Sequence, residues 1–527
     1  MTDSALQLLR QHPRLAGLAA FPFAFDLDRA AQDPGGPVRL ASGAPLEAIA
    51  GDDSGGTYFR CADGSVLYAS ADGTAGVIGS SVSEALEVVV GLPGWAAYGD
   101  PGPGADAAEV LDARAPTGTG SRAHEALDET RSEHALDAAR SEHALDAARS
   151  ELRAGLGMPA RSPAELLALL HTALGRTEPD FLLLDDADGH AYAPLHGRAR
   201  PPLWEPVLAR GRADLALLRA GDGETAAAMR QDAVRRRVVL RAAQFDRGEE
   251  DLGLLRRLLR LAAGASTTDE LRLAAVLVGR FGRAADLPLL NEVRETDFDT
   301  ACGLSELPGL DASGTELARW AQWLDESMFG TDPAGEPLLT WTGLALDQGL
   351  TEHARVALIH ELDALTLDQG RLRRPDDPSR LNPEPLGALA REFERLGDLR
   401  QALRAQRLYA ALQETAWDRV SARLTQARLE REAGRAVQAA GTLTAVRAVL
   451  ADPGDGSLAY WRRVNLGRFI AEEHYALANA LADARLPRQA RAVLAAGDAI
   501  LGELSDTAAK GVRQLAEETA TWVWGVS

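Results

Sequence analysis

The side chains of this sequence that could carry out metal, acid–base or nucleophilic chemistry are scattered. His134 and His143 stand nine positions apart, so on a helix with 100° per residue they project from opposite sides and cannot share a metal ion. His353 and His360 are seven apart and could share a helix face, but the zinc-protease pattern H-E-x-x-H does not occur. We therefore expect surface or core histidines, no metal site and no catalytic residue.

One acidic segment has part of the spacing of a calcium loop. Asp186, Asp188 and the glycine after it fit the middle of D-x-[DN]-x-[DN]-G-x₅-E. The same frame places Leu184 at the first position and Leu195 at the twelfth, so both end ligands are missing. The segment therefore predicts a hairpin turn between residues 181 and 195.

Nucleotide chemistry has little support either. Residues 221–226 fit G-x-G-x-x-A, but the sequence that follows is helical and provides no returning strand for a dinucleotide-binding unit. Lys510 is the only lysine, and it does not lie in the phosphate loop G-x-x-x-x-G-K-[ST]. This excludes Walker-type hydrolysis and argues against Schiff-base catalysis. No G-x-S-x-G nucleophile motif is present, so we expect a non-enzymatic protein without a cofactor.

Charge and cysteine usage restrict the partner and the compartment. The 527 residues include 56 basic and 77 acidic ones, which gives a net charge of −21. This balance disfavours nucleic acid and anionic membranes, and it suits a basic protein partner. Cys61 and Cys302 are far apart and form no C-x-x-C, which is typical of a reducing cytoplasm. No apolar run approaches the ~18 residues of a membrane span.

Residues 1–99 predict a small α+β domain. A helix is expected over 5–18, and Ser81 with Glu84 three positions later forms a capping-box pattern that opens a second helix. Short apolar runs separated by Gly and Asp predict strands in between. These strands are expected at residues 38–40, 46–50, 57–61, 66–69 and 76–78.

This domain resembles the SUKH superfamily, which includes fungal cell-wall regulators and bacterial toxin-immunity proteins. The similarity lies in the glycine-punctuated strand at 51–59, the strand at 66–69 and the closing helix at 81–90. The segment between the first helix and the first strand is shorter here than in the family. The resemblance implies immunity-type or regulatory binding of a protein, with a toxin as one such partner. We assign the candidate partner-binding surface to acidic and aromatic residues of the glycine-rich edge, which are Asp52, Asp53, Tyr58 and Phe59.

Residues 100–155 predict a linker. A nine-residue unit, A-L-D-[AE]-[AT]-R-S-E-[HL], occurs at 126–134, 135–143 and 144–152. Nine residues turn a helix by 900°, so successive leucines alternate between its sides and form no continuous apolar seam. We expect a solvated helical spacer, which trypsin should cut early.

The rest of the chain predicts a second small α+β unit at 156–220 and helical repeats over 221–527. Residues 271–293 resemble a HEAT-type helix pair. Tetratricopeptide-like units follow, with Gly397 and Gly434 at the turn position and Arg485 where glycine is usual. Together these segments predict an α-solenoid body.

A solenoid body favours a binding function. We expect a scaffold that binds another protein through the helical face of residues 380–500, with the N-terminal head as a second contact. Two alternatives stay open. One is a hydrolase or transferase with a dispersed site in residues 156–220, and the other is a structural adaptor of a larger complex.

Overall fold

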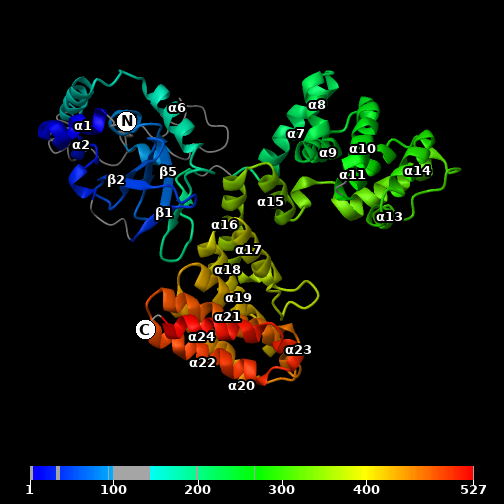
Figure 1. The fold of residues 1–527 in the computed structure, drawn as a ribbon. Coiled ribbons are helices and arrows are strands. Elements are labelled where there is room, and N and C mark those ends of the chain that lie inside the picture. The colour runs from blue at the N-terminus through cyan, green and yellow to red at the C-terminus, as the bar shows by residue number, and fades with distance from the viewer. Residues whose placement is uncertain are drawn as a thin grey trace. The chain divides into compact units, whose positions relative to one another are not determined.

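The computed structural model describes residues 4–30, 36–92, 94–98, 143–196, 200–265 and 268–525. A small N-terminal sheet region is followed by a predominantly helical body (Figure 1). The chain divides into two compact units. Unit 1 comprises Met1–Leu183 and Tyr192–Ala357, and unit 2 comprises Leu184–Ala191 and Leu358–Ser527.

The sheet of the head is an antiparallel meander in the order β2-β3-β4-β5, which β7 extends in parallel at β5. Positive φ angles at Gly55, Gly64 and Gly73 make its tight turns possible. The strands predicted between residues 38 and 78 are confirmed, with β2 and β5 longer than expected. The strands of this sheet are β2 (Leu46–Gly51), β3 (Thr57–Cys61), β4 (Val66–Ala69), β5 (Thr74–Gly79) and β7 (Ala193–Pro194). The short strands β1 (Val38–Leu40) and β6 (Leu183–Asp185) are not part of this sheet.

Both faces of this sheet are covered. Alternation along the strands places Tyr58 and Ile78 in the core beneath the helices, and Phe59 and Val77 in a second core on the opposite face. Pro13 divides the helix predicted at 5–18 into two. The helices around the head core are α1 (Ser4–Gln11), α2 (Pro13–Ala20), α3 (Val82–Gly91), 143–156 and α6 (Pro163–Leu174).

The structure corrects two of the predicted boundaries. The third nine-residue copy lies within the helix 143–156, and Leu152 is fully buried in the head core, so the spacer does not extend to residue 155. The first copy and all but the last residue of the second lie outside the described residues. Residues 156–220 form no separate unit either, because α6 packs in the head core and β7 joins the head sheet.

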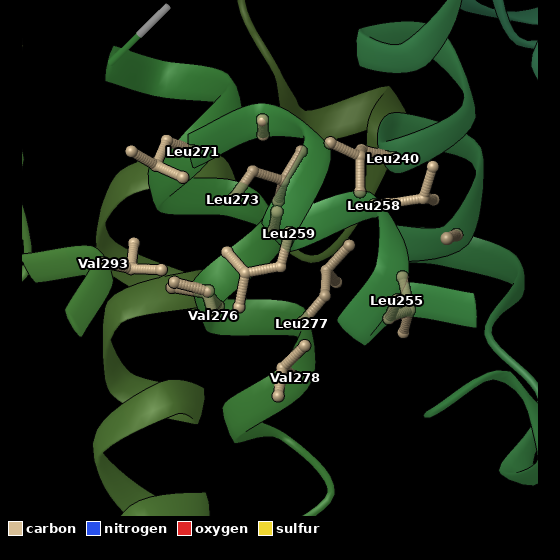
Figure 2. Packing of buried hydrophobic residues seen from close by; sticks show 14 of the residues in the cluster. Leu240, Leu255, Leu258, Leu259, Leu271, Leu273, Val276, Leu277, Val278 and Val293 are labelled. Carbon is tan, nitrogen blue, oxygen red and sulfur yellow. The ribbon is translucent and has the colours of Figure 1, made fainter. Parts of the chain in front are cut away.

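Helices make up the rest of unit 1. The middle of α11 is apolar on every side, from Leu273 to Val278, and its residues are buried among neighbouring helices (Figure 2). The helices are α7 (Trp204–Arg219), α8 (Gly223–Gln231), α9 (Ala233–Asp246), α10 (Leu252–Ala265), α11 (Thr268–Gly279), α12 (Leu287–Arg294), α13 (Phe298–Gly303), α14 (Gly314–Leu324), α15 (Leu338–Asp347) and α16 (Thr351–Leu367), whose last residues belong to unit 2. A π-helical turn, Asp325–Phe329, follows α14.

Unit 2 is built from antiparallel helix pairs. Gly397, Gly434 and Arg485 occupy equivalent turns with φ of 71°, 73° and 58°. In each turn the next residue donates its N–H to a carbonyl five positions back, at 2.7–2.9 Å. The helices are α17 (Glu384–Arg395), α18 (Leu399–Ala411), α19 (Ala416–Glu432), α20 (Ala436–Ala451), α21 (Asn465–Asp483), α22 (Pro487–Glu503), α23 (Asp506–Ala509) and α24 (Val512–Gly525).

Candidate functional site

Asp52 of the head is a buried structural acceptor. Its Oδ1 accepts from the N–H of Ser54 at 2.8 Å and from the N–H of Gly56 at 2.7 Å, and its Oδ2 accepts from the hydroxyl of Tyr68 at 2.6 Å. Burial alone would raise the pKa of this carboxyl, but these hydrogen bonds hold the pKa below its ordinary value. Asp52 therefore fixes the turn between β2 and β3, and both of its oxygens are occupied.

The aromatic residues predicted for the same surface are also buried. Tyr58 is 1% exposed and packs against Phe25 and Tyr68, with ring centroids 4.9 and 5.0 Å apart. Phe59, at 6%, lies in the core on the other face of the sheet. Of the four predicted residues only Asp53 is largely exposed, and it pairs with Arg29 at 2.9 Å. The four residues do not form one accessible surface.

A cavity of about 400 Å³ is lined mainly by residues 178–209, where the dispersed-site enzyme was placed. Its lining is largely proline, leucine, valine and alanine, together with Glu178, Arg200, Glu205 and His353. Glu178 accepts from Arg200 in a two-pronged ion pair. Glu205 and His353 are then the remaining acid–base groups among its described lining residues, and no hydroxyl, thiol or amine nucleophile stands beside them.

A cleft of about 600 Å³ lies between α9, α11 and the π-helical turn. Arg241 lines it, with its guanidinium 4.9 Å from the ring centroid of Trp341, and donates to Glu336 and to Gln244. Gln244 in turn donates to Asp325 at 2.9 Å. Burial raises the pKa of Asp325 and that of Glu336. These groups are bonded to one another, so they fix the turn and the loop after it.

His190 belongs to the short segment of unit 2 that includes the predicted hairpin turn. Gly189 has φ of 73°, and Leu184 bridges to Ala191. The Nδ1 of His190 lies 3.1 Å from Asp363, whose other oxygen accepts from the N–H of Ala191 at 3.0 Å. The cluster therefore anchors the segment within its unit.

A groove of about 460 Å³ runs between α19, α21 and α24 in unit 2. Phe469 is half exposed there, and Leu424, Ala476 and Leu515 form the rest of its apolar lining. The sequence analysis missed Phe469. The available signal was a large apolar residue just outside the buried periodicity of α21, which runs through Ile470, Ala471 and Tyr475.

The charged residues that line this groove, Arg428, Glu472 and Glu473, are each paired with a residue outside the lining. Arg428 donates to both oxygens of Glu394, at 2.7 and 2.9 Å. Glu472 accepts from Arg468 at 2.7 Å. The uncharged polar residue of the lining is Thr425, whose hydroxyl donates to the carbonyl of Ser421 at 3.3 Å.

Within the described ranges, no group of three or more His, Cys, Asp or Glu side chains is placed to hold a metal ion. No helix in that part of the chain is both long enough and apolar enough to cross a membrane. No protein-family model matches this chain, and no curated protein shows significant similarity to it.

Proposed function

We propose that this protein is a non-enzymatic scaffold whose unit 2 is a short α-solenoid that binds another protein in the groove at Phe469. The single observation that carries the proposal is this half-exposed aromatic side chain in an apolar groove. Large apolar side chains left in a concave surface are typical of recognition sites. The repeated turns at Gly397, Gly434 and Arg485 support the solenoid, because stacked pairs present a continuous helical face.

The distribution of charge changes the expected partner chemistry. Residues 358–527 contain 23 basic and 23 acidic residues, so the net charge of −21 lies wholly in residues 1–357. Residues 380–500, where we expected most of the binding surface, contain 18 basic and 14 acidic residues. Steering of a basic partner by the acidic charge therefore does not apply to this groove.

The SUKH-like head remains part of the proposal. Its resemblance makes a toxin or a regulatory target a candidate partner, and the two free cysteines fit a reducing cytoplasm. The four buried or paired residues at its glycine-rich edge are not carried into the proposed binding surface.

The test is proximity labelling by the full chain in its native cells. Phe469→Asp should remove one or a few labelled proteins. The matched control Val437→Asp changes a similarly exposed apolar residue, on α20, and should retain them. If Phe469→Asp and Val437→Asp both label the same proteins as the wild type, the groove binds no protein. Turnover of a small molecule that depends on Glu205 and His353 would instead favour the enzyme.

A further inference from the structure

The groove lies on helices that run in the same direction. Asn479 of α21 donates to Thr519 of α24 at 3.4 Å, and four residues later Asp483 accepts from Trp522 of α24 at 3.0 Å. Because residue numbers rise together along both helices, α21 and α24 are parallel. On the other side Leu424 of α19 lines the groove with residues near the start of α21, and later residues of the same two helices form an ion pair. The N-termini of all three helices therefore lie at one end of the groove.

This common direction gives the groove an electrostatic polarity. Helix dipoles place partial positive charge at the N-terminal end and partial negative charge at the C-terminal end. The rim charges add little to this, because Arg428, Glu472 and Glu473 are each held in an ion pair. A ligand charge would have to displace an existing pair, and partly exposed pairs exchange with little net gain. Recognition here depends on apolar burial.

The lining also restricts the backbone of the occupant. An extended peptide needs partners for a whole row of N–H and C=O groups, whereas the one uncharged polar side chain of the lining, Thr425, already donates its hydroxyl proton to Ser421 and can offer only its oxygen as an acceptor. An α-helix bonds its own backbone internally and presents apolar residues at i, i+3 and i+4. A helix is therefore the backbone that this groove accepts at least cost.

We infer that the occupant is an amphipathic α-helix of a partner protein that lies antiparallel to α21. A bulky apolar residue of the helix sits beside Phe469, between Leu424 and Leu515. In this orientation the dipole of the bound helix points opposite to those of the three groove helices, so ends of opposite partial charge lie next to each other. The contacting face of the helix carries no charge, so binding is insensitive to salt. This inference rests on the proposed function and specifies its ligand.

The test is selection of displayed random peptides of about 16 residues, long enough for a helix to be populated, on the full chain. We expect selected sequences with bulky apolar residues at helical spacing and without proline. Their Kd should change less than about threefold between about 0.05 and 0.5 M salt, across which surface ion pairs are screened.

Three variants locate the binding. Phe469→Asp and Ala476→Trp, which charge and fill the groove, should each weaken a selected peptide by more than about tenfold, and Val437→Asp should not. A spin label at either end of the peptide, measured against a label near Asp483, reports its direction. The inference would be overturned if the peptide lay parallel to α21, if the selected sequences were rich in proline, or if salt weakened their binding tenfold. The proposed function would still be supported by the labelling result in each of these cases. A failure to select any Phe469-dependent peptide while labelling still depends on Phe469 would also overturn the inference.

Discussion

Arg431 of α19 donates to both carboxylate oxygens of Glu473 of α21, at 2.7 and 3.0 Å. The same helix reaches in the other direction through Arg428, which holds Glu394 of α17 in the same two-pronged geometry. Two bidentate pairs therefore connect the first helices of three successive pairs. Planar two-pronged bonds fix both distance and orientation, so they set the spacing of these helices more sharply than apolar contacts do.

Removing one partner of the first pair should loosen the contact between these helices. Glu473 is 7% exposed, and Glu473→Ala leaves the Arg431 guanidinium only its longer contact with Glu432 at 3.5 Å, so we expect a loss of about 2 kcal/mol. The double variant Arg431→Met with Glu473→Leu should recover most of it. Amide hydrogen exchange of α19 and α21 in the full chain measures both. Unchanged exchange in Glu473→Ala would show that the pair is dispensable.

His474 should make unit 2 sensitive to mild acid. Burial, helped by the charge of Arg447, lowers its pKa to about 4, although the carbonyl of Ile470 accepts from its Nδ1 and opposes the shift. The unfolded chain has a pKa near 6.5 at this residue, so between these values it binds more protons than the folded chain. The contribution of His474 to the free energy of unfolding is therefore fully present above about pH 6.5, and up to about 3 kcal/mol is lost as the pH approaches 4.

The variant His474→Met isolates this effect. Methionine fills the site with an apolar side chain of similar length and removes the titrating group, so hydrogen exchange of α21 should lose most of its pH dependence across that window. An equal acid response in the variant would assign the loss to other groups.

Arg485→Gly should stabilise unit 2. Arg485 has φ of 58° at the turn between α21 and α22, in the left-handed region where a side chain costs about 1 kcal/mol. Part of the gain is lost to the greater freedom of glycine in the unfolded chain, so we expect about 0.5 kcal/mol. Gly434→Ala at the equivalent turn is the matched control and should destabilise. Protection of α21 and α22 from exchange would rise in the first variant, and no rise would contradict the assignment of strain.

Leu152→His should release the helix 143–156 from the head. Leu152 is fully buried and Arg149 donates to the carbonyl of Val90 at 3.0 Å, so the change creates a buried polar group at a cost of about 2–4 kcal/mol. Trypsin should then cut the variant at Arg149 and Arg153. In the wild type we expect these two sites to stay protected, with the first cuts at Arg114, Arg122, Arg131 or Arg140. His143→Leu, at an exposed position, is the control.

The strands and the paired turns were predictable because their signals are local. Glycine at 397 and 434 marks positive φ directly, and the offsets of Leu477, Ala478 and Ala490 within their own helix pair located the turn at Arg485 even without a glycine. Short apolar runs bounded by Gly and Asp likewise predicted β3 and β4 with their observed bounds. In each case the signal lies within the segment itself, with no need for a distant partner.

The failures concern burial by distant segments. The sheet has a core on each face, so Tyr58 and Phe59 of β3 are both covered, and the sequence of β3 alone does not show which segments cover its two faces. Leu152 was misassigned for a similar reason. Its own helix has too few apolar residues to predict burial, and the surface that covers it comes from the head. Phe469 was overlooked because neighbouring core residues masked its different orientation.

The buried Leu152 has a consequence for how the gene can vary. Tandem coding units of this kind gain and lose copies by slippage during replication. A change in copy number upstream of the docked unit alters the length of the chain before it and leaves every head contact of Leu152 and Arg149 in place. Loss of the final copy itself would bring a unit ending in histidine to that position. Selection should therefore tolerate different copy numbers among related sequences and retain the unit that ends in leucine.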